Sequence, residues 1–199
     1  MTGVLFVSGW AGVATLFPGL AARADLAVPF VDGDEAALIA RAAACPARVL
    51  AGWSTGAHML LKHGASLFPR FERVVLLAPF ARFTDSFPER AVRAMRAAMD
   101  ADAAATVRAF WENCGLPEAP AFDAAWAAPL AAGLDSLCHS AVADTPVAAA
   151  NVTVIWGEAD RIVRRKALDR ALPLLPGADL RLHAGGHWPS PDIFAEHLF

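Results

Sequence analysis

The sequence is poor in charged residues and in cysteine, and each shortage excludes a class of protein. Only 19% of its 199 residues are charged and 56% are hydrophobic, which excludes a disordered or solvating chain. The small net charge of −3 argues against nucleic acid as the main partner. The three cysteines are odd in number and widely separated, so they predict neither a disulfide framework nor a zinc site and suit a reducing cytoplasm.

Long hydrophobic runs and cofactor motifs are also missing. The apolar stretch 4–20 is interrupted by glycine and proline, and no basic residue precedes Arg23, so it predicts neither a signal peptide nor a membrane span. There is no His-Glu-x-x-His pair for zinc, no phosphate-binding glycine loop and no dinucleotide fingerprint. We therefore expect no metal, no cofactor, no contact with a membrane and a cytoplasmic location.

Buried strands and helices alternate along most of the chain, which fits one domain. The pattern predicts strands at 4–8, 26–31, 48–52, 73–78, 152–156 and 180–183, and helices at 33–44, 57–63, 163–172 and 191–199. Continuous apolar runs such as 4–8 are typical of strands that are buried on both faces. The fold class that follows is α/β, a mostly parallel sheet with helices on both faces.

Residues 80–149 have a different character, because their runs are helical, rich in alanine and interrupted by prolines. We interpret this segment as a helical lid of three or four short helices over the carboxyl edge of the sheet. The α/β core then comprises residues 1–79 and 150–199.

The first lid helix is the best defined by the sequence. Ser86 and Glu89 match a capping box, and Pro88 is tolerated in a first turn. On a helical wheel one face carries Val92, Met95 and Met99, and the other carries Arg90, Arg93 and Arg96. The basic face is either a solvated surface or a ridge that receives an acidic partner.

Residues 52–56 read Gly-Trp-Ser-Thr-Gly and match the G-x-S-x-G nucleophile elbow. This motif needs a buried strand before it and a helix after it, and both are predicted here. The turn holds the serine at a strained backbone angle, so the flanking glycines keep the space around it free of Cβ atoms. The sequence therefore predicts Ser54 as a nucleophile at the carboxyl end of the sheet.

A serine hydroxyl needs a base and an orienting acid, which in this topology follow it in the order acid, then histidine. Asp160 lies just past the predicted strand 152–156, with Glu158 and Asp135 as competing acids. His187 follows the last strand after two glycines and is the only histidine in such a loop. We predict a Ser54–His187–Asp160 triad.

Two backbone N–H groups should stabilise the negative oxygen of the tetrahedral intermediate. Thr55 is expected to supply one, because it directly follows the nucleophile and begins a helix. Trp10 is expected to supply the other, because Gly9 lets the loop after the first strand turn toward the site. An ordinary glycine turn is the alternative interpretation of that loop.

An apolar pocket beneath the lid is the expected binding site. Its candidate aromatic walls, any of which could instead be plain core, are Trp10, Phe80, Phe83, Phe110, Trp111 and Trp126.

Several stretches of the sequence carry a resemblance to a known superfamily. They are Gly9-Trp10, Gly52-Trp53-Ser54, the start of the lid at Leu77-Ala78-Pro79-Phe80, and Gly133-Leu134-Asp135-Ser136-Leu137. On these residues the chain resembles the α/β-hydrolase superfamily over nearly its whole length. Within it, the chain is most similar to the pimeloyl-(acyl-carrier protein) methyl ester esterases of biotin synthesis.

The resemblance implies hydrolysis of a methyl ester on a carrier-bound pimeloyl chain, with release of methanol. It also implies that the acidic acyl-carrier protein is received by basic lid residues, here Arg82, Arg90, Arg93 and Arg96. The chain departs from the superfamily pattern in three ways. Ser8 replaces the usual histidine before Gly9, Ala57 replaces a common third glycine, and the antiparallel strands that normally come first are missing, so the N-terminal strands are reduced.

The sequence leaves three functions to compare. The first is a serine carboxylesterase that acts through an acyl-enzyme. The second is a hydrolase of small esters, thioesters or carbon–carbon bonds with the same triad, because fold and triad serve many acyl substrates. The third is a non-catalytic binding protein that has kept the fold.

Overall fold

The computed structural model describes residues 3–116 and 118–199, and its centre is one sheet of six strands in the order β2-β1-β3-β4-β5-β6. The strands are β1 (Val4–Val7), β2 (Asp25–Ala27), β3 (Val49–Trp53), β4 (Arg73–Leu77), β5 (Val152–Gly157) and β6 (Asp179–His183). Every pair of neighbours is parallel, so all strands end at the same edge of the sheet. The predicted parallel α/β sheet is confirmed.

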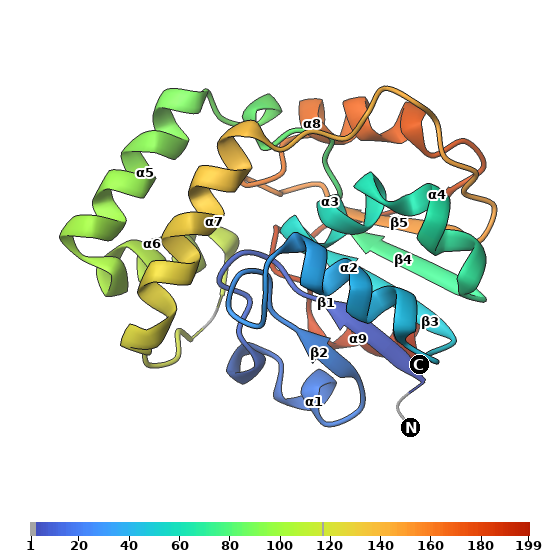
Figure 1. The fold of residues 1–199 in the computed structure, drawn as a ribbon, viewed down its shortest axis with the longest axis horizontal. Coiled ribbons are helices and arrows are strands. Elements are labelled where there is room, and N and C mark those ends of the chain that lie inside the picture. Colours follow the sequence, from blue (N-terminus) through green and yellow to red (C-terminus); the bar gives the residue numbers. More distant parts are fainter. Residues whose placement is uncertain (1–2, 117) are drawn as a thin grey trace.

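Helices cover both faces of the sheet. They are α1 (Pro18–Ala21), α2 (Glu35–Ala44), α3 (Thr55–Lys62), α4 (Gly64–Leu67), α8 (Arg165–Ala171) and α9 (Pro191–Leu198), with short 3-10 turns at Ala14–Leu16, Phe68–Arg70, Phe83–Asp85, Ala124–Trp126 and Leu172–Leu174. In Figure 1, α2 and α3 lie in front of the sheet and α9 behind it. Among the described residues, no helix is long and apolar enough to cross a bilayer.

The hydrophobic core of the protein is built around the central strands of the sheet. All residues of β1 and β3 are buried, as continuous apolar runs require when helices pack on both sides. On the face of α9, the ring of Phe6 meets those of Phe17 and Phe194 edge-on at 5.7 and 5.5 Å. These contacts fix the helices on a rigid sheet whose carboxyl edge carries the loops discussed below.

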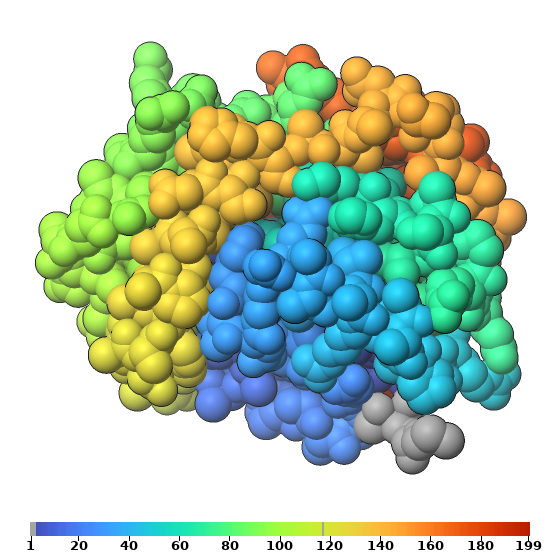
Figure 2. All heavy atoms as spheres, viewed as in Figure 1, coloured from blue at the N-terminus to red at the C-terminus, as the bar shows by residue number. Residues whose placement is uncertain are grey.

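Between β4 and β5 the chain leaves the sheet and forms α5 (Glu89–Ala101), α6 (Ala103–Cys114) and α7 (Ala127–His139). These helices stand to one side of the sheet in Figure 1, and α5 packs against both α6 and α7. Figure 2 shows α7, in yellow and orange, directly against the blue N-terminal part of the chain. The indole N–H of Trp10 donates to the carbonyl of Leu130 at 2.8 Å, which ties α7 to the loop after β1.

The strand expected at 26–31 is shorter than predicted. It ends at Ala27, because Pro29 has no N–H for a ladder and Phe30 adopts a φ of 70°, which no strand tolerates. The other expected strands and helices are present, with ends that differ by one or two residues from the predicted ranges.

The capping box predicted for α5 is wrong. The helix begins at Glu89, and extended Pro88 occupies its N-cap without a side-chain hydrogen bond. The hydroxyl of Ser86 instead accepts a hydrogen bond from the main-chain N–H of Arg164 at 3.0 Å. Ser86 therefore joins the base of the inserted helices to the loop that precedes α8.

Candidate active site

The turn between β3 and α3 has the geometry of a nucleophile elbow. Ser54 adopts φ 53° and ψ −112°, a conformation that non-glycine residues rarely take. Its N–H donates to the carbonyl of Leu77 at 2.8 Å, which anchors the turn to β4. A Cβ on Gly56 would lie 2.1 Å from the carbonyl oxygen of Val7, so only glycine permits this approach of α3 to β1.

Ser54, His187 and Asp160 form one chain of hydrogen bonds, as the sequence predicts. The distance from Ser54 Oγ to His187 Nε2 is 3.0 Å, and that from His187 Nδ1 to Asp160 Oδ2 is 2.8 Å. The side chains of His187 and Asp160 are fully buried. A carboxylate only accepts, so Nδ1 carries the proton and Nε2 is left to accept the serine proton. This tautomer is the one that a general base requires.

The loop that carries His187 is held by residues of the elbow and of β5. The indole N–H of Trp53 donates to the main-chain carbonyl of His187 at 3.0 Å. At the end of β5, a Cβ on Gly157 would lie 2.3 Å from the carbonyl oxygen of Gly185, so the two loops touch through their backbones. The base is therefore positioned by main-chain contacts as well as by Asp160.

Asp160 has a second structural role. While Oδ2 faces His187, Oδ1 accepts hydrogen bonds from the N–H groups of Ile162 and Val163 at 2.7 and 2.8 Å. This pair of bonds folds residues 160–164 into a tight turn around the carboxylate. Glu158, the competing acid, is exposed, and Asp135 pairs with Arg96 on the surface of the inserted helices.

The two residues expected to supply the oxyanion donors, Trp10 and Thr55, line the same cavity as Ser54. Gly9 makes this possible, because a Cβ there would lie 3.2 Å from Ser54 Cβ and 2.9 Å from the Trp53 ring. Thr55 is the first residue of α3, where a helix leaves its N–H groups without intrahelical acceptors. Within the described part of the chain, the N–H of Trp10 has no acceptor either. Both groups are available to an oxygen at the site.

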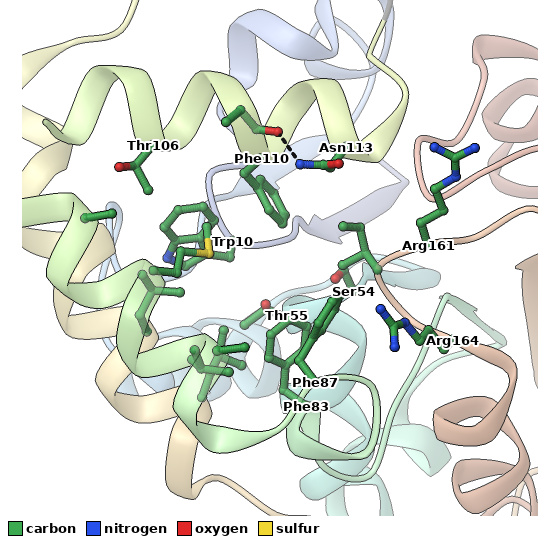
Figure 3. A pocket seen from close by; sticks show the side chains of 18 of the residues that line it. Trp10, Ser54, Thr55, Phe83, Phe87, Thr106, Phe110, Asn113, Arg161 and Arg164 are labelled. Carbon is green, nitrogen blue, oxygen red and sulfur yellow. Dashed lines mark hydrogen bonds between the residues drawn. The ribbon is translucent and has the colours of Figure 1, made fainter.

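A cavity of about 910 Å³ opens above Ser54, between the sheet edge and the inserted helices. Figure 3 shows Ser54 and Thr55 with the aromatic side chains that surround them. The wall residues, which are mostly apolar, are Trp10, Phe83, Phe87, Ala91, Val92, Met95, Ala98, Ala105, Thr106, Ala109, Phe110, Asn113, Leu134, Leu137, Asp160, Arg161, Ile162 and Arg164. This volume lies within the range of small-molecule sites in proteins.

Three of the predicted aromatic walls line this cavity, namely Trp10, Phe83 and Phe110. Phe80 and Trp111 lie outside it and belong to the core. Phe80 stacks on His58 at 4.7 Å, and the indole N–H of Trp111 donates to the carbonyl of Ala11 at 2.9 Å. Trp126 also lies outside and packs edge-on against Phe122.

The predicted arginines lie on the outer surface and do not line the cavity. Arg82 is 3.9 Å from Asp144, and Arg93 pairs with Glu89 one turn earlier on α5. Arg96 bonds both Asp100 and Asp135. Arg90 is exposed and forms no ion pair within the described residues. These arginines can therefore contact a substrate or a partner only from outside the cavity.

The sequence interpretation missed Arg161, Arg164, Phe87 and Asn113 as lining residues. The signal that could have found the two arginines is their position after Asp160, because a turn around that carboxylate presents neighbouring side chains to the same edge. No pattern in the sequence distinguishes Phe87 and Asn113 from the other residues of the segment 80–149.

His58 is a buried histidine on α3 that is not part of the triad. Its Nδ1 is 3.0 Å from the carbonyl of Phe80, which only accepts, so Nδ1 donates and Nε2 accepts from the Ser140 hydroxyl at 2.7 Å. Burial lowers the pKa of His58 to about 4, although the bond to Phe80 acts in the opposite direction. His58 therefore joins the outgoing and returning ends of the insertion as a neutral imidazole.

Solved structures share this architecture. An esterase from Exiguobacterium antarcticum is 14% identical, with a TM-score of 0.71 over 98% of this chain and 89% of its own. A lipase-esterase related protein from Clostridium acetobutylicum is 14% identical, with a TM-score of 0.65 over 92% and 86%. An N-formylmaleamic acid deformylase from Pseudomonas putida is 13% identical, with a TM-score of 0.60 over 100% and 92%.

No protein-family model and no curated protein matches the sequence. At identities this low, the likeness to solved structures establishes the fold. Together with the parallel sheet and its strand order, it shows that the chain adopts the α/β-hydrolase fold.

Proposed function

We propose that the protein is a serine carboxylesterase that acts through an acyl-enzyme. The observation that supports this most strongly is the chain of hydrogen bonds from Ser54 through His187 to Asp160, at 3.0 and 2.8 Å. Names of structures with the same fold, an esterase, a deformylase and an enol-lactonase, are consistent with hydrolysis at an acyl carbon.

In the proposed reaction, Ser54 Oγ attacks the acyl carbon and His187 Nε2 takes the serine proton. The N–H groups of Thr55 and Trp10 stabilise the oxyanion, each worth about 3–4 kcal/mol of barrier. His187 then gives the proton to the leaving alcohol, and Asp160 stabilises the imidazolium. Water, deprotonated by His187, attacks the acyl-enzyme and releases the acid and Ser54.

The preferred substrate that we propose is the methyl ester of a pimeloyl chain on acyl-carrier protein. It is supported by the resemblance in sequence, by the apolar cavity of about 910 Å³ and by the basic outer face of α5. Under this proposal the exposed arginines receive the acidic carrier, and the inserted helices act as a lid over the acyl chain. A cytoplasmic location is part of the same proposal.

A wider ester, thioester or carbon–carbon bond hydrolase is the second candidate, because the triad does not select among acyl substrates. A non-catalytic binding protein is the third. The buried and fully hydrogen-bonded triad does not favour it, since a binding protein has no need to keep a base within 3.0 Å of a serine.

An arylester assay tests catalysis directly. Wild type should hydrolyse p-nitrophenyl butyrate, and Ser54→Ala should lose about 10⁶-fold in turnover if the residues act as a unit. Ser66→Ala, which removes an exposed hydroxyl outside the cavity, is the matched control and should retain activity. Equal rates for wild type and Ser54→Ala would reject the esterase and leave the binding protein.

A second experiment tests the substrate. The gene should rescue a biotin-requiring strain that lacks its pimeloyl methyl ester esterase, and Ser54→Ala should not. If the wild-type gene is well expressed and fails to rescue, the biotin assignment is rejected, while ester hydrolysis in the first assay would still stand.

A further inference from the structure

Two arginines line the cavity that holds Ser54, and neither has a partner of opposite charge. Among the described residues, no carboxylate lies within 4.0 Å of the Arg161 or Arg164 guanidinium, and neither guanidinium donates a hydrogen bond. The next arginines along the chain differ in this respect. Arg165 pairs with Asp169, and Arg170 pairs with Asp85. Of the arginines in this segment, only the two that line the cavity lack an ion pair among the described residues, although Lys166, which lies outside the cavity, also has none.

The turn around Asp160 explains why both arginines face the same space. Asp160 Oδ1 holds the N–H groups of Ile162 and Val163, and the carbonyl of Val163 accepts the indole N–H of Trp156 at 2.8 Å. With Val163 directed into the core, its neighbours at 161 and 164 are left on the outer side of the turn, and both are exposed.

Arg164 is further held by the base of the inserted helices. Its N–H donates to the hydroxyl of Ser86, and its guanidinium lies 4.6 Å from the centre of the Phe87 ring. Figure 3 draws Arg161 and Arg164 on one side of Ser54, with Trp10 and Thr106 on the other. The cavity therefore has a cationic side next to the nucleophile and an apolar side along α5 and α6.

The charge balance of the cavity favours an anion on the cationic side. Asp160 is the only carboxyl group among the described lining residues, and it is committed to His187 and to its own turn. A guanidinium binds carboxylate or phosphate oxygens through a planar fork of donors, and such charge-assisted bonds are stronger than neutral ones. An uncharged ester would leave both guanidinium groups without an anionic partner.

We infer that Arg161 and Arg164 form an anion-binding subsite for the ester substrate. The substrate then carries a carboxylate or phosphate group on the side of the Asp160 turn and an apolar chain along α5 and α6. This inference rests on the proposed ester hydrolysis and extends it. The subsite is separate from the outer arginines of α5, because it lies within the cavity that contains Ser54.

The kinetic test compares p-nitrophenyl esters of equal chain length. One ends in a free carboxylate, one in a methyl phosphate diester and one in a neutral methyl ester. In Arg161→Gln/Arg164→Gln, KM for an anionic ester should rise about tenfold or more, while KM for the neutral ester and kcat stay near wild type. Arg161→Lys/Arg164→Lys, which keeps both charges, should recover much of the loss. Arg165→Gln, whose partner is Asp169 and which lies outside the cavity, is the matched control.

If KM rises for only one of the two anionic esters, that ester identifies the anionic group that the subsite binds. A rise in KM for either ester supports the subsite. Equal effects on neutral and anionic esters, or no effect on any, would overturn it while leaving the esterase in place. Calorimetry gives a readout that does not need turnover. Ser54→Ala should bind glutarate monomethyl ester, and adding the two glutamine substitutions should weaken that binding about tenfold. Unchanged binding of this carboxylate and of a methyl phosphate diester of the same length would reject the subsite even if no ester were hydrolysed.

Discussion

The indole N–H of Trp53 donates to the main-chain carbonyl of His187 at 3.0 Å, and the two rings lie 5.1 Å apart. The residue before the nucleophile thus holds the loop that carries the base. Ser54 and His187 are 133 positions apart in the sequence, and this bond is one of few that fix their distance.

Replacing Trp53 with phenylalanine should therefore lower both catalysis and stability. The loop loses one hydrogen bond, worth about 1 kcal/mol of unfolding free energy, and the smaller ring leaves a space at this buried position, which lowers stability further. We expect kcat on an arylester to fall about tenfold with little change in KM, because the Ser54–His187 distance is perturbed. Trp126→Phe, which alters an indole outside the cavity, should change neither value. A loss confined to KM would contradict this role.

Replacing Gly157 with alanine should push the loop that carries Asp160 away from the loop that carries His187. The new Cβ would meet the carbonyl oxygens of Gly185 and Gly186 at 2.3 and 2.4 Å, and backbone atoms cannot yield as a side chain does. We expect kcat to fall about 100-fold, with a lower melting temperature. Gly19→Ala is the control, because no atom lies within 4 Å of its new Cβ. Near-normal activity of Gly157→Ala would show that the loops can move apart without harm.

Stability should decrease as the pH falls from about 6.5 to about 4, and His58 should account for part of this. Burial lowers the pKa of His58 to about 4, while the unfolded chain has the ordinary value of 6.5. Between these values the unfolded state binds more protons than the folded state, so acid favours unfolding, by about 3 kcal/mol across this range. Urea unfolding of wild type and His58→Gln at pH 7, 5.5 and 4.5 measures the difference. Parallel pH profiles would contradict the assignment.

The outer arginines of α5 should matter only for a carrier-bound substrate. Changing Arg90, Arg93 and Arg96 to glutamate replaces three positive charges with negative ones on a surface that lies outside the cavity. We expect kcat/KM on the carrier-bound methyl ester to fall about tenfold or more at low salt, with little change on a free ester. Arg181→Glu, on β6, is the matched control. Equal losses on both substrates would mean that this face only stabilises the helix.

The sequence predicted the convergence of Ser54, Asp160 and His187 because each follows a buried strand, and parallel strands end at one edge. The ends of the strands and helices were predicted less accurately. The periodicity of a sequence indicates which residues are buried, but it does not show where main-chain pairing ends. The cavity wall was predicted only in part. A large apolar residue such as Phe80 or Trp111 is expected to be buried, but the sequence does not show whether its side chain faces a cavity or the core.

The capping box failed for a related reason. A serine three residues before a glutamate satisfies the pattern, but the hydroxyl of Ser86 has a competing donor in the N–H of Arg164, 78 positions away. Such long-range competition is invisible in a local motif. The same bond connects the insertion to the Asp160 turn, so the missed feature is the one that joins the inserted helices to the sheet edge.

One carboxylate, that of Asp160, orients the imidazole and also folds the turn that displays Arg161 and Arg164. Under the proposed function, the position of the base and the position of the anion-binding subsite therefore depend on the same turn. Adding or deleting a residue within 161–164 would slow the hydrolysis of every ester. The opposite wall includes small alanine side chains of α5 and α6, and larger side chains at those positions should shorten the chain that the cavity accepts. Trp111 of α6 must stay, because its indole is bound to the carbonyl of Ala11 in the loop after β1.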